Sequence, residues 1–175
     1  MFGFDLPIFR FFFGLTGHHG WLDGIFIFVG EWSAYLLGAV FIFYLFSRKG
    51  FKKRLWFFSS AVIPAIISRG IIAALMQFFI VSPRPSVALN LQPLFNHSVS
   101  NSFPSGHMSF FIPLGLAIFY ENKKAGLIFL FLAVLMGIGR VAGGAHWLSD
   151  ILAGIVAGVV SFYAVRWALR RFSST

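Results

Sequence analysis

The 175-residue sequence contains no cysteine and only five acidic residues. Without cysteine the chain can form neither a disulfide nor a thiolate metal site. Charged residues make up only 11% of the chain, whereas 58% is hydrophobic, and so apolar a composition excludes an intrinsically disordered protein. A soluble domain of this size has too much surface for its volume to bury so many apolar side chains. The composition therefore predicts an integral membrane protein.

Five apolar segments have about the length of membrane-spanning helices, which need about 20 apolar residues. They cover residues 25–46, 56–80, 104–120, 126–143 and 147–169. An apolar segment around Arg10 precedes them and is predicted to lie in the membrane interface as an amphipathic helix. We predict an all-α fold: an integral membrane helical bundle of about five transmembrane helices with an N-terminal interfacial helix. Residues 1–175 are expected to form a single domain.

Ten of the 14 basic residues lie in three clusters that border the apolar segments. The clusters are Arg48, Lys49, Lys52, Lys53 and Arg54; Lys123 and Lys124; and Arg166, Arg170 and Arg171. Under the positive-inside rule these clusters are cytoplasmic, which places the C-terminus inside and the loops 81–103 and 143–146 outside. Basic and aromatic residues are not interleaved on a polar surface as they are where bases stack. The positive charge therefore predicts membrane orientation and no nucleic-acid partner.

Three polar motifs lie near the predicted outer ends of the spans, and each suits chemistry on a phosphate. An arginine guanidinium matches the geometry of phosphoryl oxygens, and backbone N–H groups at a helix N-terminus bind anions. A carboxylate four residues after a histidine shares its face on a helix, and it leaves the second imidazole nitrogen free to attack. The motifs are Ser82-Pro83-Arg84-Pro85, Pro104-Ser105-Gly106-His107, and Arg140 with His146 and Asp150.

In this order and combination the motifs resemble the signature of the type 2 phosphatidic acid phosphatase (PAP2) superfamily, in its membrane branch. That signature reads Lys-x6-Arg-Pro, then Pro-Ser-Gly-His, then Ser-Arg-x5-His-x3-Asp, and the spacing of the third motif is the same here. Two positions depart from it. Gln77 stands where the signature has Lys, and Gly139 stands where it has Ser. We expect an active enzyme in which Gln77 still donates a hydrogen bond to the phosphate.

The resemblance implies a two-step phosphoryl transfer that needs no metal and no cofactor. His146 would attack phosphorus and form a phosphohistidine, with Asp150 holding its ring. His107 would protonate the departing lipid oxygen and later help to activate water. The phosphate would be bound by Arg84, Arg140, Ser105, the Gly106 backbone and Gln77.

The substrate is predicted to be a lipid phosphate at the membrane surface. Residues 15–23 resemble the start of small bacterial undecaprenyl-pyrophosphate phosphatases of this superfamily, which act in cell wall biogenesis. The loops are too short for a head-group-recognition domain, so we expect recognition by the phosphates and the tail. This places the protein in the inner (plasma) membrane with its site on the outer, periplasmic face, and no obligate protein partner is evident. Phosphatidic acid, phosphatidylglycerol phosphate and a lipid A phosphate are alternative substrates.

Two other functions remain open. A phosphotransferase of the same fold would pass the phosphoryl group to another lipid instead of water. A lipid transporter or an inactive scaffold would use the polar residues only for packing. The sequence shows no inverted repeat and no matched pair of broken helices, which counts against a transporter.

One charged pair lies inside the predicted spans, away from the three motifs. Arg69 is near the middle of the second span, where a charge costs several kcal/mol unless it has a partner. Glu31 is about two turns inside the outer end of the first span. We favour a structural ion pair between them, with contact between Arg69 and the substrate phosphate as the alternative.

Overall fold

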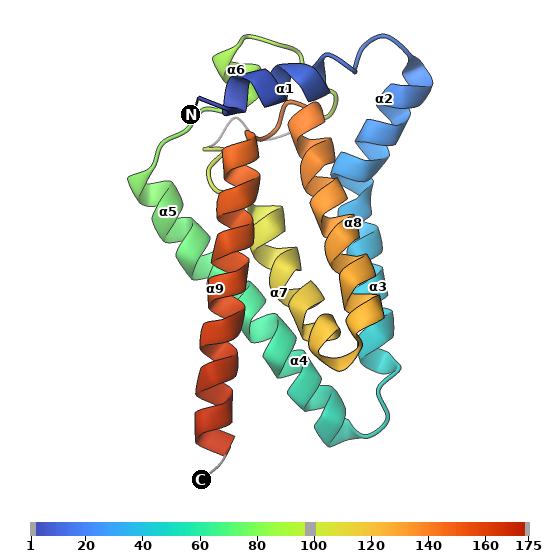
Figure 1. Cartoon of the computed structure of the whole chain (residues 1–175), viewed down its shortest axis with the longest axis vertical. Coiled ribbons are helices and arrows are strands. Elements are labelled where there is room, and N and C mark those ends of the chain that lie inside the picture. The colour runs from blue at the N-terminus through green and yellow to red at the C-terminus, as the bar shows by residue number, and fades with distance from the viewer. Residues whose placement is uncertain (1–2, 97–100, 174–175) are drawn as a thin grey trace.

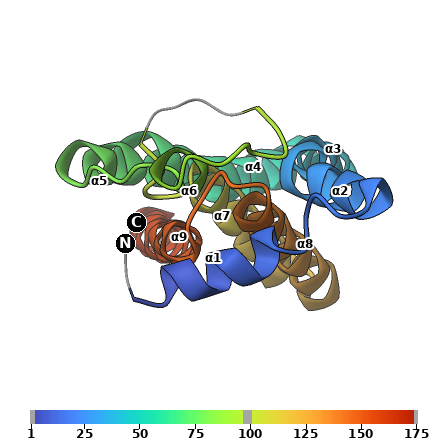
Figure 2. The same cartoon turned by 90° about the horizontal axis from the view of Figure 1, so that it is seen from above.

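The computed structural model describes residues 3–96 and 101–173, and the secondary structure of this part consists of helices. Two long continuous rods form one layer of the bundle (Figures 1 and 2). The first joins α2 (Gly20–Ile27), the π-helical η1 (Phe28–Trp32) and α3 (Ser33–Phe46), and the second joins α4 (Phe51–Ile66), the π-helical η2 (Ile67–Ile72) and α5 (Ala73–Phe79). The other layer contains α8 (Lys123–Ala142) and α9 (Leu148–Ser173). Between the two layers lies α7 (Gly106–Glu121), which contacts α4, α8 and α9.

Four helical stretches are long and apolar enough to cross a membrane: Gly20–Phe46, Phe51–Phe79, Lys123–Ala142 and Leu148–Arg171. They correspond to four of the five predicted spans and confirm the all-α membrane fold class. The remaining prediction, residues 104–120, is α7, which has only 16 residues. At 1.5 Å per residue it is about 24 Å long, shorter than the hydrocarbon core of about 30 Å. Its apolar sequence reflects burial at the centre of the bundle.

Glycines allow α7 and α9 to approach closely. A Cβ atom on Gly154 would lie 2.6 Å from the backbone oxygen of Ser105, and one on Gly158 would lie 3.0 Å from Ile112. The small residues of α9 therefore form the contact face that their four-residue spacing predicts. This contact fixes the start of α7 against the start of α9.

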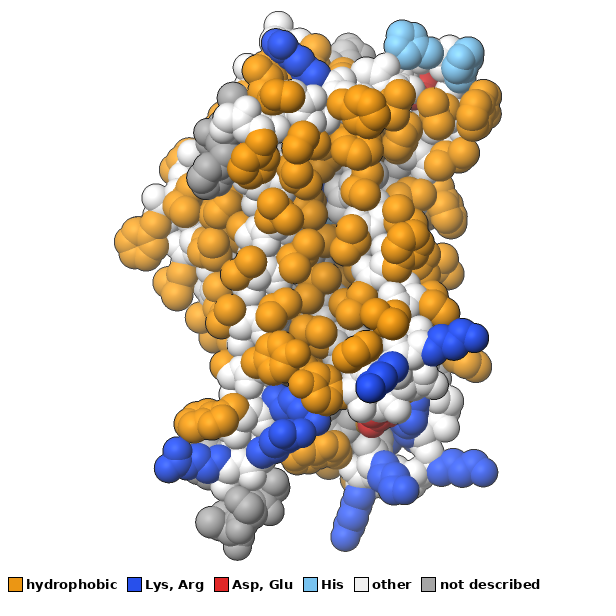
Figure 3. All heavy atoms as spheres, in the orientation of Figure 1, with side chains coloured by type: hydrophobic (Ala, Val, Ile, Leu, Met, Phe, Trp, Pro, Cys, Tyr) orange, Lys and Arg blue, Asp and Glu red, His pale blue; other side chains and the backbone are white. Residues whose placement is uncertain are grey.

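The three basic clusters meet at one end of the bundle. They occupy the α3–α4 connection with the first turn of α4, the start of α8 and the end of α9. Figure 3 shows Lys and Arg side chains gathered there below a broad band of hydrophobic ones. An ion pair of 3.1 Å between Arg48 and Glu121 joins the α3–α4 connection to the end of α7. An apolar band with cations at one end is the surface expected of a multi-pass membrane protein.

The predicted N-terminal interfacial helix is α1 (Asp5–Phe13), which lies across the opposite end of the bundle (Figures 1 and 2). Its Phe9 ring is buried against Trp147, with 5.4 Å between the ring centroids. Asp5 is completely buried and accepts hydrogen bonds from the Ser149 backbone N–H at 2.9 Å and the Ser149 hydroxyl at 2.8 Å. Ser149 is the second residue of α9. The backbone N–H at this position usually donates a hydrogen bond to the side chain of the residue just before the helix. Trp147 stands there and cannot accept, so Asp5 caps α9 from another helix.

Asp5→Ala is therefore expected to destabilise the protein. The substitution leaves the buried Ser149 donors without an acceptor, which costs about 1–3 kcal/mol. We expect a lower melting temperature of the purified protein in detergent and a smaller loss for Asp5→Asn. The matched control is Asp23→Ala, because the Asp23 carboxylate also accepts a backbone N–H, that of Gly17 at 2.8 Å, but at an exposed site. Equal melting temperatures for the two alanine variants would contradict the capping role of Asp5.

Candidate active site

A cavity of about 750 Å³ lies among η1, α3, η2, α5, the start of α7 and the end of α8. Its volume is in the range of about 300–1,000 Å³ that is typical of small-molecule sites. All three sequence motifs reach it, although they are far apart in the chain. Six predicted site residues line the cavity: Gln77, Arg84, Gly106, His107, Arg140 and His146. The other two, Ser105 and Asp150, are completely buried.

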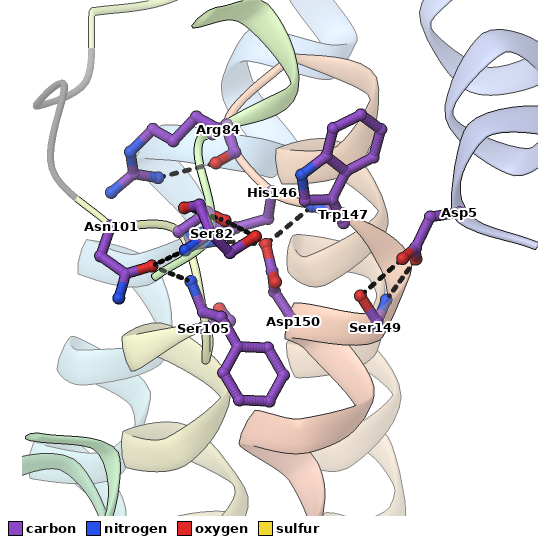
Figure 4. A network of polar contacts seen from close by, with 12 residues as sticks. Asp5, Ser82, Arg84, Asn101, Ser105, His146, Trp147, Ser149 and Asp150 are labelled. Atoms are coloured by element: carbon purple, nitrogen blue, oxygen red, sulfur yellow. Dashed lines mark hydrogen bonds and ion pairs between the residues drawn. The ribbon is translucent and has the colours of Figure 1, made fainter. Parts of the chain in front are cut away.

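His146 and Asp150 form a buried pair. The His146 Nδ1 lies 3.4 Å from the Asp150 Oδ2, and both side chains are almost fully excluded from solvent (Figure 4). His146 precedes α9, and the pair forms because Asp150, the third residue of that helix, reaches back toward it. The Asp150 Oδ2 also accepts the Trp147 N–H at 2.8 Å, which fixes the carboxylate. Nδ1 is thus directed at Asp150, and the imidazole ring lies at the wall of the cavity.

The first motif is held against the loop that carries His146. Arg84 precedes the short α6 (Pro85–Ala88) and donates from Nη1 to the Ala145 carbonyl at 2.7 Å. In return the Trp147 indole donates to the Pro83 carbonyl at 2.9 Å. Burial lowers the pKa of the Arg84 guanidinium from its ordinary value, and the Asp150 carboxylate opposes this shift. These two hydrogen bonds hold Arg84 next to the loop that carries His146.

Arg140 is positioned by a close contact between two backbones. It is buried near the end of α8 and donates from Nη1 to the Gly30 carbonyl in η1 at 3.1 Å. A Cβ atom on Gly139 would lie 2.6 Å from the Gly30 nitrogen, and one on Gly30 would lie 2.9 Å from the Gly139 carbonyl carbon. The departure from Ser at position 139 therefore has a structural reason, since only glycine lets η1 approach α8 this closely.

The second motif begins α7. Ser105 precedes the helix, but its hydroxyl makes no capping bond, and its Oγ is buried with no hydrogen-bond partner in the described part of the chain. The Ser105 N–H donates to the Asp150 backbone oxygen at 3.0 Å, which ties the start of α7 to α9. A side chain at Gly106 would overlap the guanidinium of Arg69. His107 lines the cavity within electrostatic range of Arg69, Arg84, Arg140 and His146.

The favoured sequence interpretation of Arg69 as the ion-pair partner of Glu31 is wrong. Within residues 3–96 and 101–173 the structure shows no ion pair between them, and both side chains line the cavity. The π-helical turns that carry Glu31 and Arg69 change which face of each rod these residues occupy, and the sequence gives no sign of such turns. Both residues therefore belong to the site.

Asn101 is a residue of the site that sequence reasoning missed. Its Oδ1 accepts the Ser82 N–H at 2.9 Å, and its Nδ2 donates to the Gln77 backbone oxygen at 3.0 Å. Asn101 thereby joins the end of α5 to the start of the first motif, and its side chain lines the cavity. No sequence pattern marks it, because both partners lie about 20 residues or more away.

Comparison with known proteins agrees with this geometry. Residues 60–173 match the PAP2 superfamily, and these residues hold all three motifs. The chain belongs to the PAP2 superfamily. The predicted resemblance is thereby confirmed.

Two bacterial relatives and one solved structure illustrate this PAP2 membership. The chain is 31% identical over 170 residues to the bacitracin transport permease protein BcrC of Bacillus licheniformis, covering 97% of this chain and 82% of that protein. It is 28% identical over 158 residues to the undecaprenyl-diphosphatase BcrC of Bacillus subtilis (strain 168), covering 89% and 79%. The crystal structure of Aquifex aeolicus LpxE is similar with a TM-score of 0.70 and 25% identity, covering 93% of this chain and 96% of that one.

Proposed function

We propose that this PAP2 protein is a lipid phosphatase that removes the terminal phosphate of undecaprenyl pyrophosphate. The observation that carries the proposal is the buried His146–Asp150 pair beside a cavity lined by arginines. One relative is named for undecaprenyl diphosphate hydrolysis and another for bacitracin transport. A histidine held by a carboxylate at the wall of a cavity is the arrangement of an activated nucleophile. This arrangement favours hydrolysis over transport as the function of this chain.

Unused donors for a phosphoryl group lie at the cavity wall and directly beside it. The Ser105 Oγ, the Arg84 Nε and the Arg140 Nε are buried and have no hydrogen-bond partner among the described residues. Buried polar groups are nearly always bonded, so these atoms point to a bound anion. The start of α7 adds the Gly106 N–H, because the first N–H groups of a helix favour negative charge. We propose that these four groups bind the phosphate that is transferred, with the Gln77 amide as a further donor.

The proposed reaction has two steps. The His146 Nε2 attacks the terminal phosphorus, a P–N bond forms, and the bond from phosphorus to the bridging oxygen breaks. His107 gives its proton to that oxygen, so the lipid monophosphate leaves. His107 then takes a proton from water, which attacks the phosphohistidine, and inorganic phosphate is released with His146 free again. Asp150 holds the imidazole ring in both steps.

The arginines would supply the positive charge that metal ions supply in many other phosphatases, so we propose a metal-independent reaction. The three basic clusters lie at the opposite end of the bundle from α1 (Figures 1 and 3). Under the positive-inside rule this arrangement supports a cytoplasmic C-terminus and a site on the outer, periplasmic face of the inner (plasma) membrane. On that face the site would meet the head group of the lipid substrate. We propose that residues 1–175 form a single domain.

The test is phosphate release by the purified protein in detergent with EDTA present. Undecaprenyl pyrophosphate, phosphatidic acid and phosphatidylglycerol phosphate are supplied separately and in competition. We expect EDTA-resistant release with the highest kcat/KM for undecaprenyl pyrophosphate. Release that stops with EDTA would contradict the metal-independent mechanism, and faster release from phosphatidic acid would contradict the substrate. Release that depends on an added acceptor lipid would identify a phosphotransferase instead.

A further inference from the structure

We infer that Arg69 is a substrate-binding residue that supplies the cation missing at position 77. The inference rests on the proposed phosphatase function and adds one residue to the same site. In the superfamily signature the first motif begins with Lys, and this chain has Gln77 there. Both Gln77 and Arg69 come from the second rod, and both line the cavity.

The surroundings of Arg69 leave its charge for a ligand. It lies in η2, inside a stretch that is long and apolar enough to cross a membrane. Within the described residues the structure gives its guanidinium no carboxylate partner, and Glu31 lines the same cavity without pairing to it. A cation at this depth is costly unless it is partnered. An anionic head group in the cavity would provide the partner.

The position of the guanidinium identifies which part of the site it serves. It lies against the Gly106 Cα, where any larger residue at position 106 would overlap it. Gly106 begins α7, and its N–H is one of the donors proposed above for the transferred phosphate. A guanidinium beside that N–H can bind the same anion, since its planar set of donors matches phosphoryl oxygens.

The remaining cations flank the same point. His107, the next residue of α7, is within electrostatic range of Arg69, Arg84 and Arg140. Arg84 and Arg140 each give one Nη1 to a backbone carbonyl and keep Nε without a partner in the part of the chain that the structure describes. Arg69 makes no such backbone bond there, so its donors remain for the substrate. The superfamily signature has one more cation than this chain at position 77, where Gln77 replaces Lys. Arg69 supplies that further cation beside Arg84 and Arg140.

The experiment exchanges the two positions. The variants are Arg69→Gln, Arg69→Lys, Gln77→Lys and the double variant Arg69→Gln with Gln77→Lys, assayed as kcat and KM for phosphate release from undecaprenyl pyrophosphate. Arg69→Gln is expected to lower kcat/KM by about 10- to 100-fold, the loss typical of one hydrogen bond to a charged group. Adding Gln77→Lys is expected to restore most of that loss, and Arg69→Lys should retain more activity than Arg69→Gln. A merely structural arginine would not be replaced by a lysine two turns away.

The matched control is Arg10→Gln, which removes an exposed arginine of α1 outside the cavity and should leave kcat/KM unchanged. A second measurement guards against misfolding: the rise in melting temperature that inorganic pyrophosphate gives should be smaller for Arg69→Gln than for the wild type. An unchanged rise, activity of Arg69→Gln equal to wild type, or a loss that Gln77→Lys does not restore would each overturn the inference. Failure of the proposed function is distinct, because the wild type itself would then release no phosphate.

Discussion

His146→Ala is expected to abolish phosphate release from undecaprenyl pyrophosphate, with kcat lowered by about 10⁴-fold or more. Losses of this size are typical when the nucleophile of a covalent mechanism is removed. The Asp150 carboxylate and the arginines remain in the variant, but the nitrogen that forms the P–N bond is gone. The measurement is initial-rate phosphate release by purified protein in detergent, with the melting temperature recorded for each preparation.

The control for this variant is His18→Ala. His18 is exposed, and its Nε2 lies 3.1 Å from the Gly14 carbonyl near the end of α1. It does not line the cavity, so its removal should leave kcat near the wild-type value. A folded His146→Ala variant that keeps a tenth of the wild-type activity would exclude His146 as the nucleophile. A transporter or scaffold would retain its function in the same variant.

Gly139→Ser restores the residue of the superfamily signature and is nevertheless expected to be harmful. Its Cβ atom would lie 2.6 Å from the Gly30 nitrogen and 2.8 Å from the Gly30 Cα. These are backbone atoms, so η1 or α8 must move, and overpacking of this kind costs typically about 1–3 kcal/mol. The same movement would disturb the 3.1 Å hydrogen bond from Arg140 to the Gly30 carbonyl. We expect a lower melting temperature together with reduced kcat/KM.

The matched control is Gly38→Ser in α3, where an added Cβ atom meets nothing within 4 Å. Because glycine is the poorer helix former, this variant should be as stable as the wild type or slightly more stable. If Gly139→Ser were as stable and active as Gly38→Ser, the close approach of η1 and α8 would not constrain position 139. Higher activity of Gly139→Ser would show instead that the missing hydroxyl limits the enzyme.

The sequence predicted the membrane fold, and it singled out most of the residues that meet at the cavity, because both depend on local patterns. Apolar runs mark the long helices, and the motif spacing brings out His107, Arg140, His146 and Asp150. The bounds of α7 were predicted closely, but its place at the centre of the bundle was not, since a short buried helix has the same composition as a helix facing lipid. The cap that Asp5 gives to α9 joins residues 144 positions apart and leaves no local pattern.

Gly139 and Arg69 show why the remaining details needed the structure. The sequence shows only that Gly139 lacks the hydroxyl of the signature Ser. The contact with Gly30 on another helix explains why glycine stands at this position. Pairing Arg69 with Glu31 assumed regular α-helices, whereas η1 and η2 are π-helical at these two residues. Such π-turns occur frequently at functional sites, and here each one carries a charged residue into the cavity.

The most direct test of the proposed mechanism is to trap the phosphorylated enzyme. The protein is mixed with undecaprenyl pyrophosphate labelled in its terminal phosphate, quenched in base, digested and analysed by mass spectrometry. We predict a phosphoryl group on His146 that survives base and is lost in acid, and none in the His146→Ala variant. Labelling of another residue, or rapid turnover with no labelled protein at any quench time, would contradict the covalent mechanism.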